Sequence, residues 1–184
     1  MTPDKTSSSS KKTLIGMLAV FVLPVILAKV ALDNEWFNRG ATNKGQLIAP
    51  TLNLSNQLTG VSPKWRLLYV MPENCDASCE NALFSINQVW LALGKNADRA
   101  EALVLTTSLS DQSAIAQLGE YPNVRTLSVD EAIDGLSSNK VYVVDTQYNA
   151  MLFYAITPDK AVAVMESRNM LADMRKLLKL SRIG

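Results

Sequence analysis

The chain has 184 residues, with 18 lysine and arginine residues against 17 aspartate and glutamate residues, which gives a formal net charge of +1. Nucleic-acid binding generally needs a clear basic excess, so this balance argues against nucleic acid as a partner. Because the sequence contains two cysteines and no histidine, it excludes Ser-His-Asp triads, Cys-His dyads and histidine-based zinc sites.

An uncharged run, LIGMLAVFVLPVILA, occupies residues 14–28 near the N-terminus. Residues 13–32 are long enough to cross a hydrocarbon core of about 30 Å as a helix that rises about 1.5 Å per residue. Lys5, Lys11 and Lys12 precede the run, so the positive-inside rule predicts that residues 1–12 form a cytoplasmic tail. We therefore predict a single-pass helix in the lipid bilayer of a bacterial inner membrane, with the following domain in the periplasm.

A cleaved signal peptide is the competing interpretation of the same run. Cleavage after Ala31 would place Lys29 at a position that requires a small residue, and cleavage after Val30 is no better. A retained anchor is therefore the preferred prediction. About 150 residues remain outside the N-terminal segment, which is the size of one ordinary domain.

Beyond the anchor, residues 33–63 contain repeated glycine and proline and are predicted to form an irregular lead-in. Residues 64–184 are predicted to form a domain of alternating strands and helices. The predicted elements are a strand over 65–71, a helix over 75–93, a strand over 101–107, a short helix over 111–118 with Asp111 as its cap, a strand over 124–129, a short helix over 130–135, a hairpin of strands over 141–145 and 150–156, and a helix over 167–180.

This order of elements predicts the fold class. Strands that alternate with helices indicate a mostly parallel sheet with helices on both faces, and the hairpin adds antiparallel edge strands. The predicted class is therefore α/β. We expect a thioredoxin-like domain, with a mixed sheet and flanking helices, after one N-terminal transmembrane helix.

The two cysteines, Cys75 and Cys79, form a CxxxC motif, CDASC, at the corner between the first predicted strand of the domain and the helix that follows. With Cys75 in the turn and Cys79 in the first helical turn, their Cα atoms fall within the range of about 4.4–6.8 Å that a disulfide needs. Three roles are open: reversible thiol–disulfide exchange, Cu(I) binding by two thiolates, and a fixed structural disulfide. Open α/β sheets bind ligands at such corners, which favours the first two roles.

Two stretches, WRLLYVMPENCDASCENALFSINQVW and VYVVDTQYNAMLFYAI, resemble the Sco family of thioredoxin-like copper proteins of cytochrome oxidase assembly. The stretches RGATNKGQLIAP, CDASC, LALGKNADR and LLKLSRIG are similar to a proteobacterial group of membrane-anchored proteins associated with cytochrome oxidase genes. The resemblance implies that Cys75 and Cys79 occupy the positions of paired copper cysteines. It also implies Cu(I) as a bound metal, and a cytochrome c oxidase subunit or assembly factor as a partner.

The sequence departs from the Sco pattern and from the thioredoxin pattern just before the strand that begins at Val141. Sco proteins have a histidine there as a third copper ligand, whereas this chain has Ser137, Ser138 and Asn139. Thioredoxins have a cis-proline before the corresponding strand, and no proline precedes it here. A complete Sco copper site and an ordinary thioredoxin site are therefore both disfavoured.

The leading hypothesis is a membrane-anchored periplasmic accessory factor of cytochrome c oxidase assembly, in which Cys75 and Cys79 act in thiol redox chemistry or Cu(I) handling. If the protein is an enzyme, it is a thiol–disulfide oxidoreductase. The alternative is a degenerate thioredoxin-fold scaffold that binds oxidase subunits and has a structural disulfide. Five methionines dispersed in the domain are expected to pack in the core rather than bind copper. They are Met71, Met151, Met165, Met170 and Met174.

Overall fold

The computed structural model describes residues 7–33 and 43–181. The chain divides into two compact units, residues 1–42 and 43–184. The first unit contains one described helix, α1 (Ser7–Asp33). Its segment Lys12–Ala31 has a mean hydropathy of 2.5 and is long and apolar enough to cross a membrane. This candidate span coincides closely with the predicted transmembrane segment 13–32.

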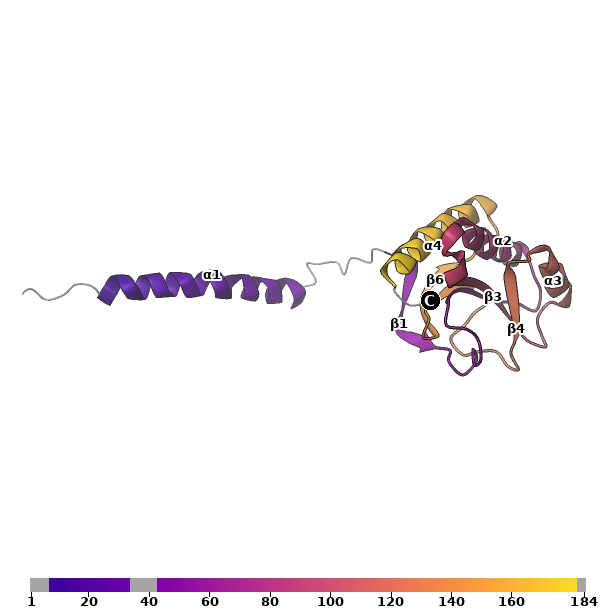
Figure 1. The fold of residues 1–184 in the computed structure, drawn as a ribbon, viewed down its shortest axis with the longest axis horizontal. Coiled ribbons are helices and arrows are strands. Elements are labelled where there is room, and N and C mark those ends of the chain that lie inside the picture. The colour runs from indigo at the N-terminus through magenta and orange to yellow at the C-terminus, as the bar shows by residue number, and fades with distance from the viewer. Residues whose placement is uncertain (1–6, 34–42, 182–184) are drawn as a thin grey trace, which may run out of the picture. The chain divides into compact units, whose positions relative to one another are not determined.

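The second unit is built around one mixed sheet (Figure 1). The strands lie in the order β1-β6-β5-β2-β3-β4, in which β2, β3 and β4 are parallel and the other neighbours are antiparallel. This arrangement confirms the predicted mixed sheet. Three of the five strand pairings are antiparallel and β5 lies inside the sheet, so the predictions of a mostly parallel sheet and of a hairpin at its edge are wrong. The elements are β1 (Gln46–Asn53), β2 (Trp65–Val70), α2 (Ala77–Ala92), a 3-10 helix (Gly94–Arg99), β3 (Ala100–Thr106), α3 (Gln112–Gln117), a 3-10 turn (Leu118–Glu120), β4 (Val124–Ser128), β5 (Lys140–Val144), β6 (Asn149–Ala155) and α4 (Lys160–Leu180).

Strand β1 corrects the prediction that residues 33–63 are irregular. It pairs antiparallel with β6 at the edge of the sheet, with an irregular register between Leu47 and Leu52. Most of its side chains are exposed, and it contains Pro50 after a cis peptide bond. A sheet edge tolerates proline, and an exposed strand lacks the apolar alternation that marks a strand in sequence. For these two reasons the sequence did not indicate a strand at β1.

Helices cover one face of the sheet, and loops cover the other. Helices α2 and α4 lie side by side over the first face (Figure 1), where α3 also contributes buried residues. The second face is covered by segments 54–62 and 129–136, whose Leu54 and Leu58 are fully buried. The prediction of helices on both faces, and of a helix over 130–135, is therefore wrong. Residues 129–136 form bends and turns, with a positive φ of 86° at Gly135.

Aspartate caps set where the domain's α-helices begin. The Asp76 carboxylate accepts hydrogen bonds from the amides of Ser78 and Cys79, each at 3.0 Å, so α2 begins at Ala77 rather than at Cys75. Asp159 likewise caps α4, which begins seven residues before the predicted position. A side-chain oxygen at this position satisfies amide donors that the first helical turn leaves unpaired.

The buried guanidinium of Arg66 binds one of the loop segments that cover the second face of the sheet. Arg66 is fully buried, and its Nε donates to Glu101 Oε2 at 2.8 Å. Its Nη1 donates to the Lys64 carbonyl at 2.9 Å, and its Nη2 donates to the Ser62 carbonyl. The second carboxylate oxygen of Glu101 accepts from Arg125 at 2.5 Å. The end of the segment over residues 54–64 is therefore fixed by hydrogen bonds to one side chain of β2.

A buried carboxylate fastens the start of the domain to α4. Asp173 Oδ2 accepts three hydrogen bonds: from the Lys44 amide at 2.7 Å, the Gly45 amide at 2.9 Å and the Tyr154 hydroxyl at 2.6 Å. A Cβ at Gly45 would lie 2.6 Å from the Tyr154 ring, so this position requires glycine. Burial and the Asp173 carboxylate both raise the pKa of Tyr154, so the phenol stays protonated and donates.

Candidate functional site

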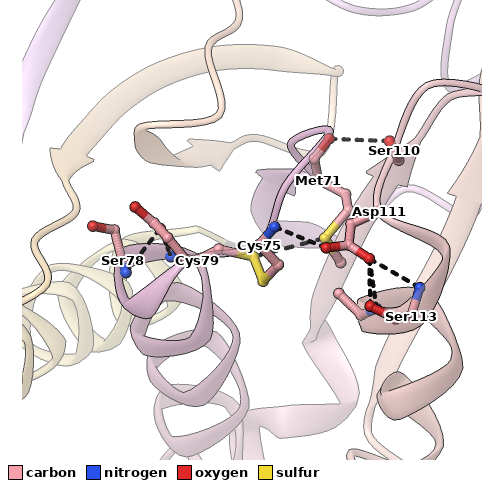
Figure 2. The surroundings of a disulfide bond; sticks show 9 residues. Met71, Cys75, Ser78, Cys79, Ser110, Asp111 and Ser113 are labelled. Carbon is pink, nitrogen blue, oxygen red and sulfur yellow. Dashed lines mark hydrogen bonds between the residues drawn. A yellow bond between two sulfur atoms is a disulfide. The ribbon is translucent and has the colours of Figure 1, made fainter.

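The cysteine pair lies at the carboxyl end of β2, where the chain turns into α2. Cys75 lies in the turn and Cys79 in the first turn of the helix, as the sequence analysis assumed. The two residues form a disulfide, with a Cα–Cα distance of 5.2 Å. Figure 2 shows the disulfide with the side chains of Met71 and Asp111 directed toward it. The structure therefore brings the two predicted site residues together at the predicted corner.

The two sulfur-bearing residues differ in exposure. Cys79 is buried in the helix-covered core, with 1% of its surface exposed, whereas Cys75 is partly exposed. Cys75 also lines a hollow of about 200 Å³ between α2 and α3, together with Glu80, Asp111 and Tyr121. A reagent from solvent therefore reaches Cys75 and not Cys79.

Asp111 connects the cysteine turn to α3. Its Oδ2 accepts from the Cys75 amide at 2.9 Å, and its Oδ1 caps α3 by accepting from the amides of Ser113 and Ala114. The Ser113 hydroxyl donates to the same Oδ1 at 2.6 Å. Hydrogen bonds from the Ser113 hydroxyl and the Cys75 and Ala114 amides lower the pKa of Asp111 to about 2. Asp111 is thus an anion that fixes the backbone of the accessible cysteine.

Sequence reasoning placed Asp111 as a helix cap but missed its contact with the cysteine turn. A signal for this contact was available. Asp111 follows β3, which is parallel to β2, and the carboxyl ends of parallel strands meet at the same edge of a sheet. The Asp111 amide also donates to the Pro72 carbonyl at 2.8 Å, which joins the two loops a second time.

The backbone amides of the two cysteines, which could otherwise stabilise a thiolate, donate hydrogen bonds to carboxylates. The Cys79 amide donates to Asp76 and the Cys75 amide donates to Asp111. Negative charge beside a thiol disfavours the thiolate. Tyr69 lies behind this corner, and its hydroxyl has no hydrogen-bond partner among the described residues. Burial and the charge of Asp76 raise the pKa of Tyr69, so that group stays neutral.

A third soft donor lies beside the disulfide. The Met71 Sδ is 3.7 Å from Cys79 Sγ, and Met71 is 3% exposed. Within the residues that the structure describes, no group of three or more histidine, cysteine, aspartate and glutamate side chains could hold a metal ion. Before β5, Ser137 Oγ donates to Asn139 Oδ1 at 2.5 Å, and the Ser137 amide donates to the Tyr142 hydroxyl at 2.8 Å. The candidate metal ligands at this corner are therefore sulfur atoms, which suit Cu(I).

Comparison with known proteins places the domain among thioredoxin-like folds. Residues 65–181 match the family model described as "Transmembrane-like, thioredoxin-like, C-terminal domain". No curated protein matches the sequence of this chain.

Several solved structures resemble the chain at low identity. Yeast Sco1 is 13% identical with a TM-score of 0.50, and the match covers 71% of this chain and 87% of that one. Copper-bound ScoI from Arabidopsis thaliana is 14% identical with a TM-score of 0.46, covering 72% of this chain and 98% of that one. Copper-bound ScoI from Bradyrhizobium japonicum is 19% identical with a TM-score of 0.39, covering 68% and 98%. At these identities the likeness, carried by yeast Sco1, concerns the fold alone.

Proposed function

The chain belongs to the family of transmembrane-like, thioredoxin-like C-terminal domains, and on that premise we propose that it is a membrane-anchored accessory factor of cytochrome c oxidase assembly. Its Cys75–Cys79 pair alternates between a disulfide and a dithiol, and the dithiol handles Cu(I) as cargo. The observation that carries the proposal is the disulfide at the strand-to-helix corner, in which one cysteine is accessible and the other is buried. The sequence resemblance to Sco proteins supports the oxidase part.

The difference in exposure gives the exchange reaction an order. A thiolate of a partner dithiol attacks Cys75 Sγ, the Cys75–Cys79 bond breaks, and Cys79 leaves as a thiolate that takes up a proton. The second thiol of the partner then attacks the partner's first sulfur in the mixed disulfide and releases Cys75. The partner becomes a disulfide and this chain becomes a dithiol, so electrons and protons balance. In the reverse direction, Cys75 attacks a disulfide formed between the copper ligands of a client protein.

The surroundings of the pair favour binding of a cation once the disulfide is reduced. Two thiolates are soft donors that suit Cu(I). Asp76 and Asp111 lie on either side of the pair and hold its backbone amides, so the site is negative before the metal binds. The neighbouring carboxylates make thiolates costly in the metal-free protein. A bound Cu(I) cation offsets this cost, because it stabilises the deprotonated form of the cysteines.

The anchor and its orientation complete the proposal. Helix α1 carries the candidate membrane span, and the lysines before it favour a cytoplasmic N-terminus with the domain in the periplasm. The proposed organisation is a tail over 1–12, an inner-membrane helix over 13–32, and a thioredoxin-like domain that begins near residue 43. A domain so tethered works next to a membrane-embedded client, for which we propose an oxidase subunit or assembly factor.

Trapping of mixed disulfides tests the order of exchange. In the purified full chain, Cys79→Ser should form a stable mixed disulfide through Cys75 with a protein that carries a disulfide, because the Cys75 thiolate attacks that bond and no second cysteine of this chain releases the partner. Cys75→Ser should trap at least about tenfold less, since Cys79 is buried. Ser78→Ala, which keeps both cysteines, is the control and should cycle like the parent. Equal trapping by both single-cysteine variants would contradict the proposed order.

An assay in cells tests the biological role. The double variant Cys75→Ser with Cys79→Ser should lower oxidase activity and the copper content of membranes, whereas Ser78→Ala should leave both unchanged. If the double variant supports full activity and the disulfide also resists mild reductant, the protein is a scaffold with a structural disulfide, and the cysteine role is wrong.

A further inference from the structure

The side chain that touches the buried sulfur belongs to Met71, the residue that follows β2. Met71 Sδ lies 3.7 Å from Cys79 Sγ (Figure 2). In the disulfide, Cys79 has no thiol proton to donate, so the contact joins two sulfur atoms directly. Both residues are almost completely buried, at 3% and 1% exposed. The thioether thus lies against the pair from the side opposite to solvent.

The position of Met71 does not depend on the disulfide. Its amide donates to the Leu105 carbonyl at 2.9 Å, which continues the pairing of β2 with β3. Its carbonyl accepts from the buried Ser110 hydroxyl at 3.0 Å. Opening the Cys75–Cys79 bond breaks neither hydrogen bond. The backbone that carries the thioether is therefore held in place before and after reduction, as a preorganised ligand requires.

Chemistry and distance both suit a three-sulfur site. Thiolates and thioethers are soft ligands that select Cu(I). In a trigonal site with metal–sulfur bonds of about 2.3 Å, neighbouring sulfurs lie about 4 Å apart. The contact between Met71 and Cys79 is already close to this separation. Reduction lets Cys75 Sγ move away from Cys79 Sγ to a similar distance, because the Cα atoms are 5.2 Å apart.

From this geometry we infer that Met71 is the third ligand of a Cu(I) site completed by the reduced Cys75 and Cys79. The inference rests on the proposed function and deepens it, since it names the donor that takes the place of a histidine. Binding converts two thiols to thiolates and releases two protons, and copper stays Cu(I) throughout. Met71 packs in the core, as predicted for the five methionines of the domain, and its sulfur faces the pair. The same prediction is wrong for Met165, which is 56% exposed.

Copper X-ray absorption on selenomethionine-labelled protein tests the inference by detecting the thioether ligand directly. The full chain in detergent is reduced, loaded with one equivalent of Cu(I) and measured at the copper edge. We expect two sulfur neighbours and one selenium neighbour. Met71→Leu should lose the selenium neighbour, whereas Met174→Leu, which alters a fully buried methionine of α4, should keep it. Copper bound without a selenium neighbour in the parent chain overturns the inference.

Competition with a coloured Cu(I) chelator gives an independent readout. Loss of an outer-shell partner already lowers metal affinity by about 10–100-fold, so loss of a direct ligand in Met71→Leu should weaken Cu(I) binding at least about tenfold. Met174→Leu should bind like the parent. If Met71→Leu and the parent bind Cu(I) with equal affinity, only the assignment of Met71 as a ligand is overturned. Failure of the reduced parent to bind Cu(I) removes the copper part of the proposed function and Met71 with it, while the thiol-trapping result still stands.

Discussion

The two faces of the sheet are covered in different ways. Helices α2 and α4 cover one face, and α2 carries Cys79 into that core. Loops cover the other face, and Arg66 binds the carbonyls of Ser62 and Lys64 at the end of one of them. The helix-covered face depends mainly on apolar contact, whereas the loop-covered face depends on a buried charge.

The difference follows from where backbone hydrogen bonds are made. A helix pairs its own amides and carbonyls, so it needs only an apolar stripe to cover a sheet. A loop leaves carbonyls unpaired, and a buried unpaired carbonyl is costly. The five N–H groups of a guanidinium can satisfy several carbonyls at once. The cysteine pair lies on the face whose packing depends less on buried polar groups, which suits the proposed opening and closing of the disulfide.

Replacing the buried guanidinium should have the largest effect. Arg66→Met leaves Glu101 Oε2 and the carbonyls of Ser62 and Lys64 without their donor, and should lower the free energy of unfolding by about 3–5 kcal/mol in urea titration. Arg125→Met is the control, because Arg125 binds the same carboxylate from a side chain that is 60% exposed. It should cost about 0–1 kcal/mol. Similar losses in the two variants would contradict the special role of the loop-covered face.

The next largest effect tests a buried polar link on the helix-covered face. Asp173→Ala leaves the amides of Lys44 and Gly45 and the Tyr154 hydroxyl without their acceptor, and should cost about 3 kcal/mol of unfolding free energy. Tyr154→Phe removes one of the three donors and should cost about 1 kcal/mol. Urea titration of both variants checks the ratio. A loss for Tyr154→Phe as large as that for Asp173→Ala would contradict the role of the carboxylate as the shared acceptor of three donors.

Opening the disulfide should cost less than either change. The cysteines are four positions apart, and a cross-link that closes so short a loop contributes only about 2 kcal/mol. The double variant Cys75→Ser with Cys79→Ser should therefore stay folded, with a guanidinium midpoint close to that of the reduced parent. Unfolding of the reduced parent at neutral pH would contradict a pair that cycles, and would favour a structural disulfide.

The smallest effect should be the pH dependence that Asp111 contributes. Its pKa is about 2 in the folded protein and about 3.9 in an unfolded chain, so the ionised carboxylate stabilises the fold. This contribution is fully present above about pH 4 and is lost as the pH falls through about 2. The difference in Tm between the parent and Asp111→Asn should therefore shrink between pH 5 and about pH 2. Ser113→Ala, which removes the hydroxyl donor to this carboxylate, should reduce the same difference.

The sequence predicted the strands and helices that have a strong local pattern. The buried strands β2, β3 and β5, the helix α2 and the cap at Asp111 all appear close to their predicted positions. The edge strand β1 could not be predicted because its exposed side chains follow no apolar alternation. The packing of loops over the second face could not be predicted, because it depends on contacts between residues far apart in sequence, such as Arg66 and Glu101.

The corner of the candidate site was predictable, but its surroundings were only partly so. The spacing of Cys75 and Cys79 and their place before a helix indicated a disulfide-capable pair. The parallel pairing of β2 and β3 was predictable from the alternation of strands and helices, and it brings Asp111 to the same edge as the cysteine turn. The hydrogen bond from the Cys75 amide to Asp111 depends also on the conformations of two loops, which no local pattern reports. The approach of Met71 to Cys79 depends on rotamers in the core, so the sequence indicated only an apolar side chain.

The burial of Met71 also bears on how long the site lasts under oxidative stress. Peroxide converts an accessible thioether to a sulfoxide, which is polar and disrupts packing. Met165, on the outer side of α4, is 56% exposed, whereas Met71 is 3% exposed. An oxidant in solution therefore reacts with Met165 long before it reaches the thioether beside the cysteines. The same core that holds Met71 in place also protects its sulfur from chemical damage.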